Sequence, residues 1–329
     1  MKKIINKTAD VEQQMIEGMV KAYPQHVKKL DCGNVVVRAN KKTDKVALVS
    51  GGGSGHEPAH GGFVGEGMLD CAVAGPAFTS PTPDQIYEGI KAVATPKGVL
   101  CVVKNYTGDV MNFEMAVDMA KDEGIEARCV VVNDDVAVKD SLYTTGRRGV
   151  AGTILVHKIA GAKAETGASL EEVAVIAEKV IGNVRTMGMA TLPCTVPASG
   201  KPGFALAEAE MEIGIGIHGE PGTHREKMRP ADEVVDLLLD KITADIDYAG
   251  REVAVIVNGM GATPLMELFI VNNRVHDYLT AKNIKIYDTL VGNYMTSIEM
   301  AGFSITLLRL DAELKELYDA KATAPAFRR

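Results

Sequence analysis

The stretch "KVALVSGGGSGHEPAHGG", from Lys45 to Gly62, decides how the fold is interpreted. Its first six residues are typical of a buried strand, and a glycine loop follows them. The end of the stretch matches H-E-x-x-H, in which two histidines one helical turn apart bind zinc. Pro58 lies between His56 and His60 and would cost about 3 kcal/mol or more inside a helix. We therefore expect a loop, and a zinc hydrolase using His56 and His60 is only a remote alternative.

Strand and helix patterns alternate on either side of this stretch. Apolar strand-like runs lie at 45–50, 70–75, 98–106 and 126–134, and amphipathic helical patterns lie at 82–94, 109–124 and 169–184. Capping boxes begin the first and the last of these helices, at Thr82 and Ser169. This alternation predicts an α/β fold with a mostly parallel sheet covered by helices on both faces.

A segment rich in proline and glycine, "LPCTVPASGKPGF" at 192–204, separates this region from the rest of the chain. After it come a helical pattern at 230–242 and strand patterns at 251–259, 285–292 and 303–310. We expect two domains: an N-terminal α/β domain over 1–186 and a smaller C-terminal α+β domain over 187–329.

Composition favours a protein of the cytoplasm that acts on small molecules. The chain has 329 residues, 46% of them hydrophobic, and its net charge is −7. The charge and the absence of a lysine or arginine cluster argue against nucleic acid, and no apolar run is long enough to span a membrane. The five scattered cysteines indicate free thiols in a reducing compartment.

Motifs for nucleotide binding fail on their context. The glycines at 51–55 are followed by His56 and Glu57, not by the lysine and hydroxyl residue of a P-loop. A G-x-G-x-x-G match starts at Gly214, but Glu220-Pro221-Gly222 follows it where a helix would have to begin. We therefore expect no nucleotide and no metal on this chain.

Polar side chains follow the four N-terminal strands at their carboxyl ends. They are His56, Ser80, Lys104 with Asp109, and Asp134. Ligands of open α/β sheets bind at these ends, so the side chains should converge beside a glycine loop whose N–H groups could hold ligand oxygens.

Other interpretations stay open for most of these residues. Asp109 could cap a helix, Lys104 could be solvated, and Ser80 could shape the turn before Pro81. His56 is more easily explained by function, and a role for His218 is as probable as a structural one. The segment at 144–153 could hold an anion or pack between domains. The histidines expected to be structural or exposed are His26, His60, His157, His224 and His276.

Six motifs together resemble the K subunit of dihydroxyacetone kinase, and they span nearly the whole chain. They are "SGGGSGHEPAHGGFVG" (50–65), "AFTSPTPDQI" (77–86), "KNYTGDVMNFEMA" (104–116), "TTGRRGVAGT" (144–153), "GIGIHGEPG" (214–222) and "NGMGATPLMELF" (258–269).

The resemblance implies a set of site residues. His218 would capture the C2 carbonyl of dihydroxyacetone as a covalent hemiaminal. Asp109 would be the base on the reacting hydroxyl, and His56 a second acid/base or positioning group. The remaining residues expected around the substrate are Gly53, Ser54, Gly55, Ser80 and Lys104.

The resemblance also implies partners. The chain ends at Arg329 without an added ATP-binding domain, so it is expected to be the separate subunit of a phosphoenolpyruvate-dependent kinase of glycerol metabolism. An L subunit would carry ADP or ATP with magnesium, a phosphohistidine M subunit would recharge it, and this chain would form a homodimer. The alternative is a non-catalytic paralogue that senses dihydroxyacetone and binds a transcription regulator.

Overall fold

The computed structural model describes residues 2–141 and 144–329, and two six-stranded sheets organise them. The first sheet has the order β1-β2-β4-β3-β5-β6. Its strands are β1 (Val27–Lys29), β2 (Val35–Arg38), β3 (Ala47–Ser54), β4 (Cys71–Ala77), β5 (Val99–Lys104) and β6 (Ala127–Val132). The pairs among β4, β3, β5 and β6 are parallel, and at one edge of the sheet β2 pairs antiparallel with both β1 and β4.

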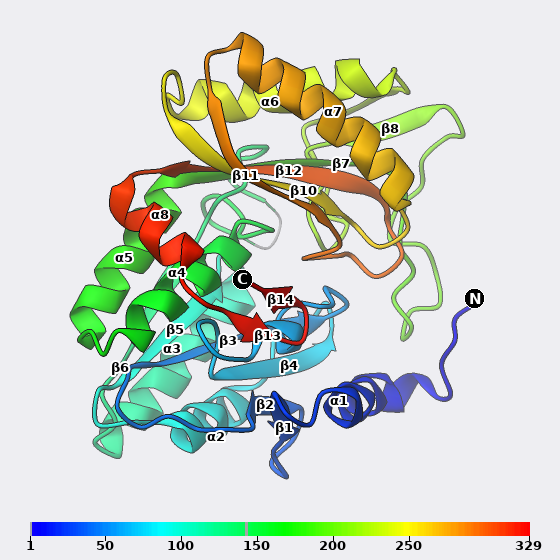
Figure 1. Ribbon diagram of the computed structural model, residues 1–329. Coiled ribbons are helices and arrows are strands. Elements are labelled where there is room, and N and C mark those ends of the chain that lie inside the picture. The colour runs from blue at the N-terminus through cyan, green and yellow to red at the C-terminus, as the bar shows by residue number, and fades with distance from the viewer. Residues whose placement is uncertain (1, 142–143) are drawn as a thin grey trace.

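Helices cover both faces of this sheet, as the alternating pattern predicts (Figure 1). One face carries α2 (Pro83–Val93) and α3 (Thr107–Asp122), and the other carries α4 (Thr153–Glu165) and α5 (Leu170–Asn183). The N-terminal helix α1 (Val11–Ala22) packs near β1 and β4. The capping box of α5 is complete, since Ser169 Oγ accepts the Glu172 N–H at 3.3 Å and Glu172 accepts the Ser169 N–H at 2.8 Å.

The second sheet is mixed and has the order β11-β10-β12-β7-β8-β9. Its strands are β7 (Val184–Leu192), β8 (Glu210–Ile213), β9 (His224–Lys227), β10 (Glu252–Gly259), β11 (Lys285–Gly292) and β12 (Ala301–Leu310). Helices α6 (Ala231–Asp245) and α7 (Leu265–Ala281) cover its outer face in Figure 1. Helices α4, α5 and α8 (Ala312–Asp319) lie between the two sheets.

The two halves of the molecule share a core. One cluster of buried apolar side chains contains residues of both sheets, such as Leu100 and Ile256. The expected division after residue 186 falls inside β7, and the C-terminal hairpin of β13 (Thr323–Ala324) and β14 (Phe327–Arg328) returns to the first half, where Thr323 pairs with Glu66. Continuous packing therefore joins the two sheets.

The expected glycine loop after residue 50 is instead a part of β3, which continues to Ser54. The prediction of a loop was wrong because glycine here permits close contact and does not interrupt the strand. A Cβ atom on Gly51 would lie 2.3 Å from Val73 O, and one on Gly53 would lie 2.5 Å from Thr79 N. The strand is glycine-rich because its neighbours occupy the space of side chains.

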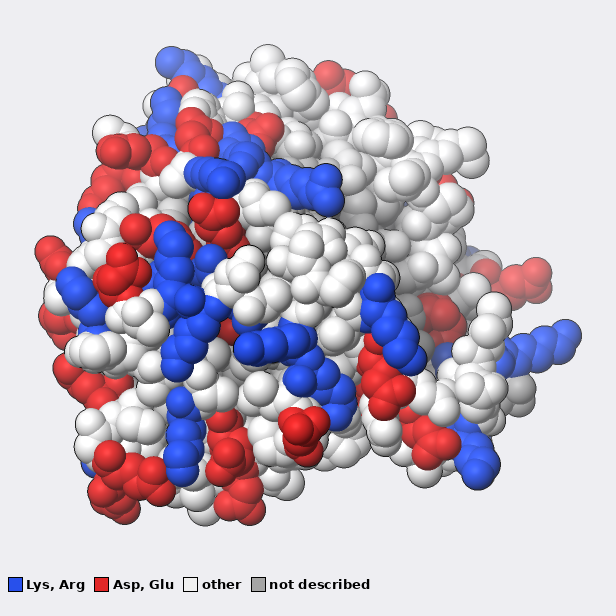
Figure 2. Space-filling model, turned by 60° about the horizontal axis from the view of Figure 1, so that its bottom comes forward, with Lys and Arg blue, Asp and Glu red and all other residues white. Residues whose placement is uncertain are grey.

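The face of the molecule shown in Figure 2 mixes charges of both signs, with lysine and arginine side chains interspersed among aspartate and glutamate. Opposite charges also pair directly within the described ranges, as Arg38 does with Asp70 and Glu165. This face is unlike the basic stripe of a nucleic-acid-binding surface. None of the helices in the described ranges is long and apolar enough to cross a bilayer.

Candidate active site

A cavity of about 470 Å³ opens at the carboxyl ends of β3, β4 and β5. The first half of the chain supplies most of its lining, and the loop after β8 supplies one histidine. The lining residues are Gly53, Phe78, Thr79, Ser80, Tyr106, Gly108, Asp109, Asn112 and His218. The structure thus brings His218 and Asp109 to one cavity, although 109 positions separate them in sequence.

A tight turn presents His218 to this cavity. The Gly219 N–H donates to Gly216 O at 3.1 Å, and the Gly216 N–H donates to Glu220 O at 3.0 Å. A Cβ atom on Gly216 would lie 2.0 Å from a carboxylate oxygen of Glu220, so only glycine fits there. The buried guanidinium of Arg148 donates to Gly214 O at 2.7 Å and to Asp135 at 2.7 Å, which ties this loop to the first half of the chain.

Glu220 fixes the proton on His218. Its carboxylate lies 3.0 Å from His218 Nδ1 and also accepts the His218 backbone N–H at 2.8 Å. Burial opposes ionisation of Glu220, but the His218 ring and Arg148 lower the pKa of this carboxyl to about 2. A carboxylate only accepts, so Nδ1 of the neutral ring carries the hydrogen and Nε2 carries the lone pair.

The ring of His56 also carries its hydrogen on Nδ1. Its Nδ1 lies 2.8 Å from the Thr296 carbonyl oxygen, which makes Nδ1 the donor. Burial, His218 and Lys104 lower the pKa of His56 well below its ordinary value, so the ring is neutral. Nε2 is buried and makes no hydrogen bond within the described residues. The ring of His56 lies beside His218 but is not among the residues that line the cavity, and a function for His56 stays a prediction.

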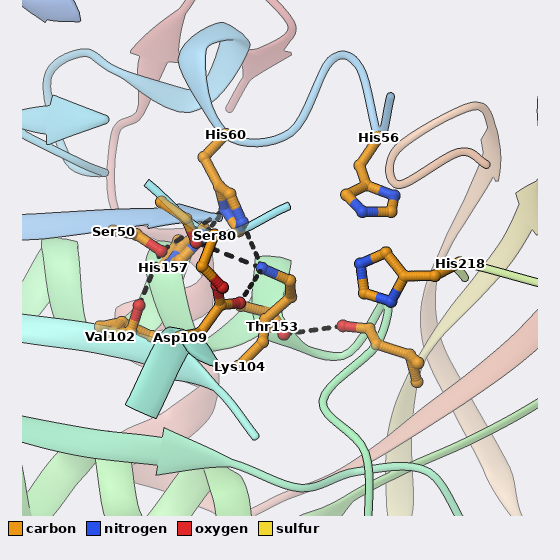
Figure 3. A network of polar contacts seen from close by, with 12 residues as sticks. Ser50, His56, His60, Ser80, Val102, Lys104, Asp109, Thr153, His157 and His218 are labelled. Atoms are coloured by element: carbon orange, nitrogen blue, oxygen red, sulfur yellow. Dashed lines mark hydrogen bonds and ion pairs between the residues drawn. The ribbon is translucent and has the colours of Figure 1, made fainter. Parts of the chain in front are cut away.

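Aromatic rings enclose the imidazole of His218. The centroids of Tyr106, His56 and Phe78 lie 4.5, 4.8 and 5.2 Å from its centroid, all in edge-to-face arrangements. Figure 3 shows the rings of His56 and His218 facing one another. These neighbouring rings leave the imidazole little freedom to rotate.

Asp109 is the third residue of α3 and does not cap it. Its carboxylate accepts the hydroxyl of Ser80 with one oxygen and lies 3.3 Å from Lys104 Nζ with the other. The N-cap position belongs to Tyr106. The capping alternative is therefore wrong, and the helix N-terminus instead favours the negative charge of Asp109.

Lys104 lies beneath the cavity lining and is fully buried. Its ammonium is 3.2 Å from Gly51 O, 3.1 Å from His60 Nε2 and 3.3 Å from Asp109 Oδ2. A Cβ atom on Gly52 would lie 2.4 Å from Nζ, so this glycine makes room for the ammonium. The alternative of a solvated lysine is wrong, and Figure 3 shows Nζ between His60 and Asp109.

The glycine segment contributes less free backbone than its sequence indicates. The Gly55 N–H donates to both carboxylate oxygens of Glu57 at 3.1 Å, and the Ser54 hydroxyl donates to Gly75 O at 2.7 Å. Ser54 lines another cavity, beneath α1, and Gly53 lines both that cavity and the cavity of His218. The expectation that the N–H groups of this segment are exposed is wrong for Gly55, because Glu57 folds back onto it.

Asp134 does not join the cavity either. Its carboxylate accepts the N–H groups of Val150 and Gly152, both at 2.8 Å, just before α4. The segment at 144–153, expected as a possible anion site, therefore does hold an anion, and that anion is a side chain of the same protein. Strand position alone could not separate this structural carboxylate from Asp109.

Residues 56–60 do not form the helical turn that would bring His56 and His60 together around a zinc ion. Residues 56–60 form a bend and turns, and the two rings diverge, with His60 Nε2 3.1 Å from Lys104 Nζ and His56 beside His218. Across the ranges that the structure describes, no group of three histidine, cysteine or acidic side chains could hold a metal ion.

Sequence reasoning missed several residues of the site. Glu220 and Tyr106 were not singled out, although both lie next to recognised residues in "GIHGEPG" and "KNYTGD". His60 and His157, which were expected to be structural or exposed, are both buried, and His60 lies between His157 and Lys104. A carboxylate two positions after a histidine between glycines was the available signal for Glu220.

A model of the Dak1 domain matches residues 17–326. The chain belongs to the Dak1 domain family. This match confirms the resemblance read from the six motifs. A relative from Listeria innocua, the dihydroxyacetone-binding subunit DhaK of PTS-dependent dihydroxyacetone kinase 1, is 57% identical over 314 residues, which are 95% of each chain.

Two solved structures of this family superpose over nearly the whole chain. The dihydroxyacetone kinase operon co-activator Dha-DhaQ is 37% identical with a TM-score of 0.90, and the match covers 98% of both chains. The dihydroxyacetone kinase of C. freundii in complex with AMP-PNP and Mg²⁺ is 33% identical with a TM-score of 0.90, and the match covers 99% of this chain and 61% of that one.

Proposed function

We propose that this chain is the dihydroxyacetone-binding subunit of a phosphoenolpyruvate-dependent dihydroxyacetone kinase. The observation that carries the proposal is the tautomer of His218, whose Nδ1 faces Glu220 and whose Nε2 therefore keeps its lone pair. His218 and Asp109 line the same cavity. The relative from Listeria innocua, named as the dihydroxyacetone-binding subunit of its kinase, supports the same conclusion.

In the first step the lone pair of His218 Nε2 adds to the C2 carbonyl carbon of dihydroxyacetone. The carbonyl oxygen becomes a hydroxyl by taking a proton from solvent, and the positive charge that develops on the ring is balanced by Glu220. The triose offers little surface for binding, so a covalent hemiaminal holds it in place and orients its terminal hydroxyl.

In the second step Asp109 accepts the proton of that terminal hydroxyl while its oxygen attacks the γ-phosphorus of ATP. The bond to ADP breaks, and the phosphorylated triose stays bound to His218. The C2–Nε2 bond then breaks, its electron pair returns to Nε2, and the C2 hydroxyl gives its proton to solvent, so that dihydroxyacetone phosphate leaves with its carbonyl restored. Ser80 and Lys104 hold the carboxylate of Asp109 in one orientation. His56, buried beside His218, is proposed as the second acid/base or positioning group.

The phosphoryl donor is proposed to reach the cavity on a partner. An L subunit would carry ADP or ATP with Mg²⁺ and would be recharged by a phosphohistidine M subunit. Support comes from the C. freundii enzyme, whose structure contains AMP-PNP and Mg²⁺ and of which this chain matches 61%.

A regulatory role is the second candidate, since the co-activator Dha-DhaQ shares 37% identity and the whole fold. A sensor requires capture of the ligand but no base for phosphoryl transfer. Asp109 here is held by Ser80 and Lys104 at the lining of the cavity, and this arrangement favours catalysis.

The proposed homodimer has a candidate surface on α7. Four neighbouring apolar side chains are exposed there: Leu265, Met266, Phe269 and Ile270. The opposite side of the same helix is buried against the second sheet through Leu268 and Val271. A contiguous apolar patch on an outer helix is typical of a protein interface, and we propose a second copy of this chain as its occupant.

Native mass spectrometry tests the proposed capture. Wild-type protein incubated with dihydroxyacetone should gain the mass of one triose, and the mass should persist under conditions that strip non-covalent ligands. His218→Ala should gain none. An adduct of equal occupancy in His218→Ala would assign the nucleophile to another residue.

A further inference from the structure

A chain of buried histidines lies beneath the cavity and outside the steps described above. His60 Nδ1 is 3.0 Å from His157 Nε2, and His60 Nε2 is 3.1 Å from Lys104 Nζ. All three side chains are almost completely removed from solvent. Figure 3 shows the two histidines on the side of Lys104 away from His218.

The donors of Lys104 set the direction of every hydrogen bond in this chain. An ammonium has three hydrogens and no lone pair, and Nζ has three acceptors within 3.3 Å, which are Gly51 O, Asp109 Oδ2 and His60 Nε2. His60 must therefore present a lone pair at Nε2 and carry its hydrogen at Nδ1.

The hydrogen on His60 Nδ1 then points to His157 Nε2, which must also carry a lone pair. Ser50 Oγ lies 3.5 Å from the same Nδ1, but its own hydrogen is directed to Val102 O at 2.6 Å. Both histidines are thus in the Nδ1–H form. His157 Nδ1 has no hydrogen-bond partner in the described ranges, so the chain ends there.

Neither ring competes with Lys104 for the positive charge. Burial, Lys104 and His157 lower the pKa of His60 well below its usual range, and burial with Lys104 lowers the pKa of His157 to about 3. Two neutral rings therefore support a single cation, which in turn faces the carboxylate of Asp109.

We propose that His60, backed by His157, is a positioning residue that aims the Lys104 ammonium at Asp109. Without an acceptor at His60 Nε2, one hydrogen of a buried ammonium would be unsatisfied, and the side chain would turn away from Asp109 to satisfy it. This inference rests on the proposed function of Asp109 as the base. It assigns His60 an effect on turnover and none on substrate capture.

Two substitutions of His60 separate its two nitrogens. The amide oxygen of His60→Gln reaches about as far as Nε2 and can accept from Lys104, whereas the shorter His60→Asn reaches only the position of Nδ1. We expect His60→Asn to lower kcat about 10- to 100-fold, because this factor corresponds to the free energy of one hydrogen bond to a charged group. His60→Gln should restore most of the rate.

The readouts are kcat and KM for dihydroxyacetone, measured with the partner subunits, and adduct occupancy by native mass spectrometry. KM and adduct occupancy should change little in either variant. His276 is exposed, and His276→Gln serves as the control for replacing a histidine outside the buried chain. Equal rates in His60→Asn and His60→Gln, or a parallel loss of adduct and kcat, would overturn the proposal.

The tautomers of the two histidines can be measured by NMR without any turnover, so this measurement does not depend on the proposed function. Two-bond ¹H–¹⁵N correlations on ¹⁵N-histidine-labelled wild-type protein should show His60 and His157 as Nδ1–H tautomers, assigned through His60→Gln and His157→Phe. A hydrogen on Nε2 of either ring would contradict the chain. Failure of the wild type to form an adduct would instead reject the proposed function and leave this result standing.

Discussion

Glu220 holds His218 twice, through the ring Nδ1 at 3.0 Å and through the backbone N–H at 2.8 Å. One carboxylate thus sets both the tautomer of the imidazole and the shape of the turn that presents it. A nucleophilic nitrogen needs a free lone pair, and this contact supplies it at Nε2.

Replacing Glu220 by glutamine should therefore weaken capture. The amide can donate toward Nδ1, which favours hydrogen on Nε2 and removes the lone pair. We expect the affinity for dihydroxyacetone to fall about 10- to 100-fold, as for one hydrogen bond to a charged group. Calorimetric titration measures it, with the exposed Glu208→Gln as control. Unchanged affinity in Glu220→Gln would show that the tautomer is set by other groups.

Asp109→Asn should separate capture from phosphoryl transfer. Asparagine keeps the size of the side chain and an acceptor for Ser80 or Lys104, but it cannot take a proton from the substrate. Adduct occupancy should stay at the wild-type level, while kcat should fall about 10²- to 10⁴-fold, the usual contribution of a general base. A residual rate near wild type would restrict Asp109 to substrate binding.

The buried histidines make stability depend on pH in a defined direction. The pKa of His157 is about 3 in the folded protein against an ordinary value of 6.5. Below pH 6.5 the unfolded chain takes up a proton that the folded protein does not, so the free energy of unfolding falls with falling pH. This single group contributes a slope of up to about 1.4 kcal/mol per pH unit.

Denaturant unfolding between about pH 5.5 and about pH 4.5 isolates that contribution. His157→Phe removes the titrating group and keeps a ring in its place, so its stability should depend less steeply on pH than that of the wild type. Other groups titrate in both proteins and cancel in the comparison. Identical slopes would mean that His157 is protonated in the folded state.

The patch on α7 predicts a dimer that a single charge disrupts. Phe269→Glu places a carboxylate at the centre of the four exposed apolar side chains and should shift the protein toward monomer in light scattering after size-exclusion chromatography. Val175→Glu, which alters an exposed apolar residue on α5, should leave the oligomeric state unchanged. A dimer that persists in Phe269→Glu would move the interface elsewhere.

Regular patterns made the architecture predictable from the sequence. The apolar runs at 45–50, 70–75, 98–106 and 126–134 correspond to β3, β4, β5 and β6, and the expected helices correspond to α2, α3 and α5. The end of β3 was misplaced because glycine is common both in loops and in strands that a neighbour approaches closely.

The site was predictable only in part, since position along a strand does not reveal what a side chain contacts. Asp109 and Asp134 both follow strands, yet one lines the cavity and the other binds the backbone before α4. His60 and Lys104 lie 44 residues apart in sequence, and only the fold shows that they touch. The family motifs singled out His218, and the spacing of Glu220 from it was the only sequence signal for their contact, which the fold shows.

A crystal soaked in dihydroxyacetone tests the central claim most directly. The account predicts continuous electron density from His218 Nε2 to C2 of the triose, a tetrahedral geometry at that carbon, and a terminal hydroxyl within hydrogen-bonding distance of Asp109. Density joined to His56, or a planar triose lying free of His218, would contradict it.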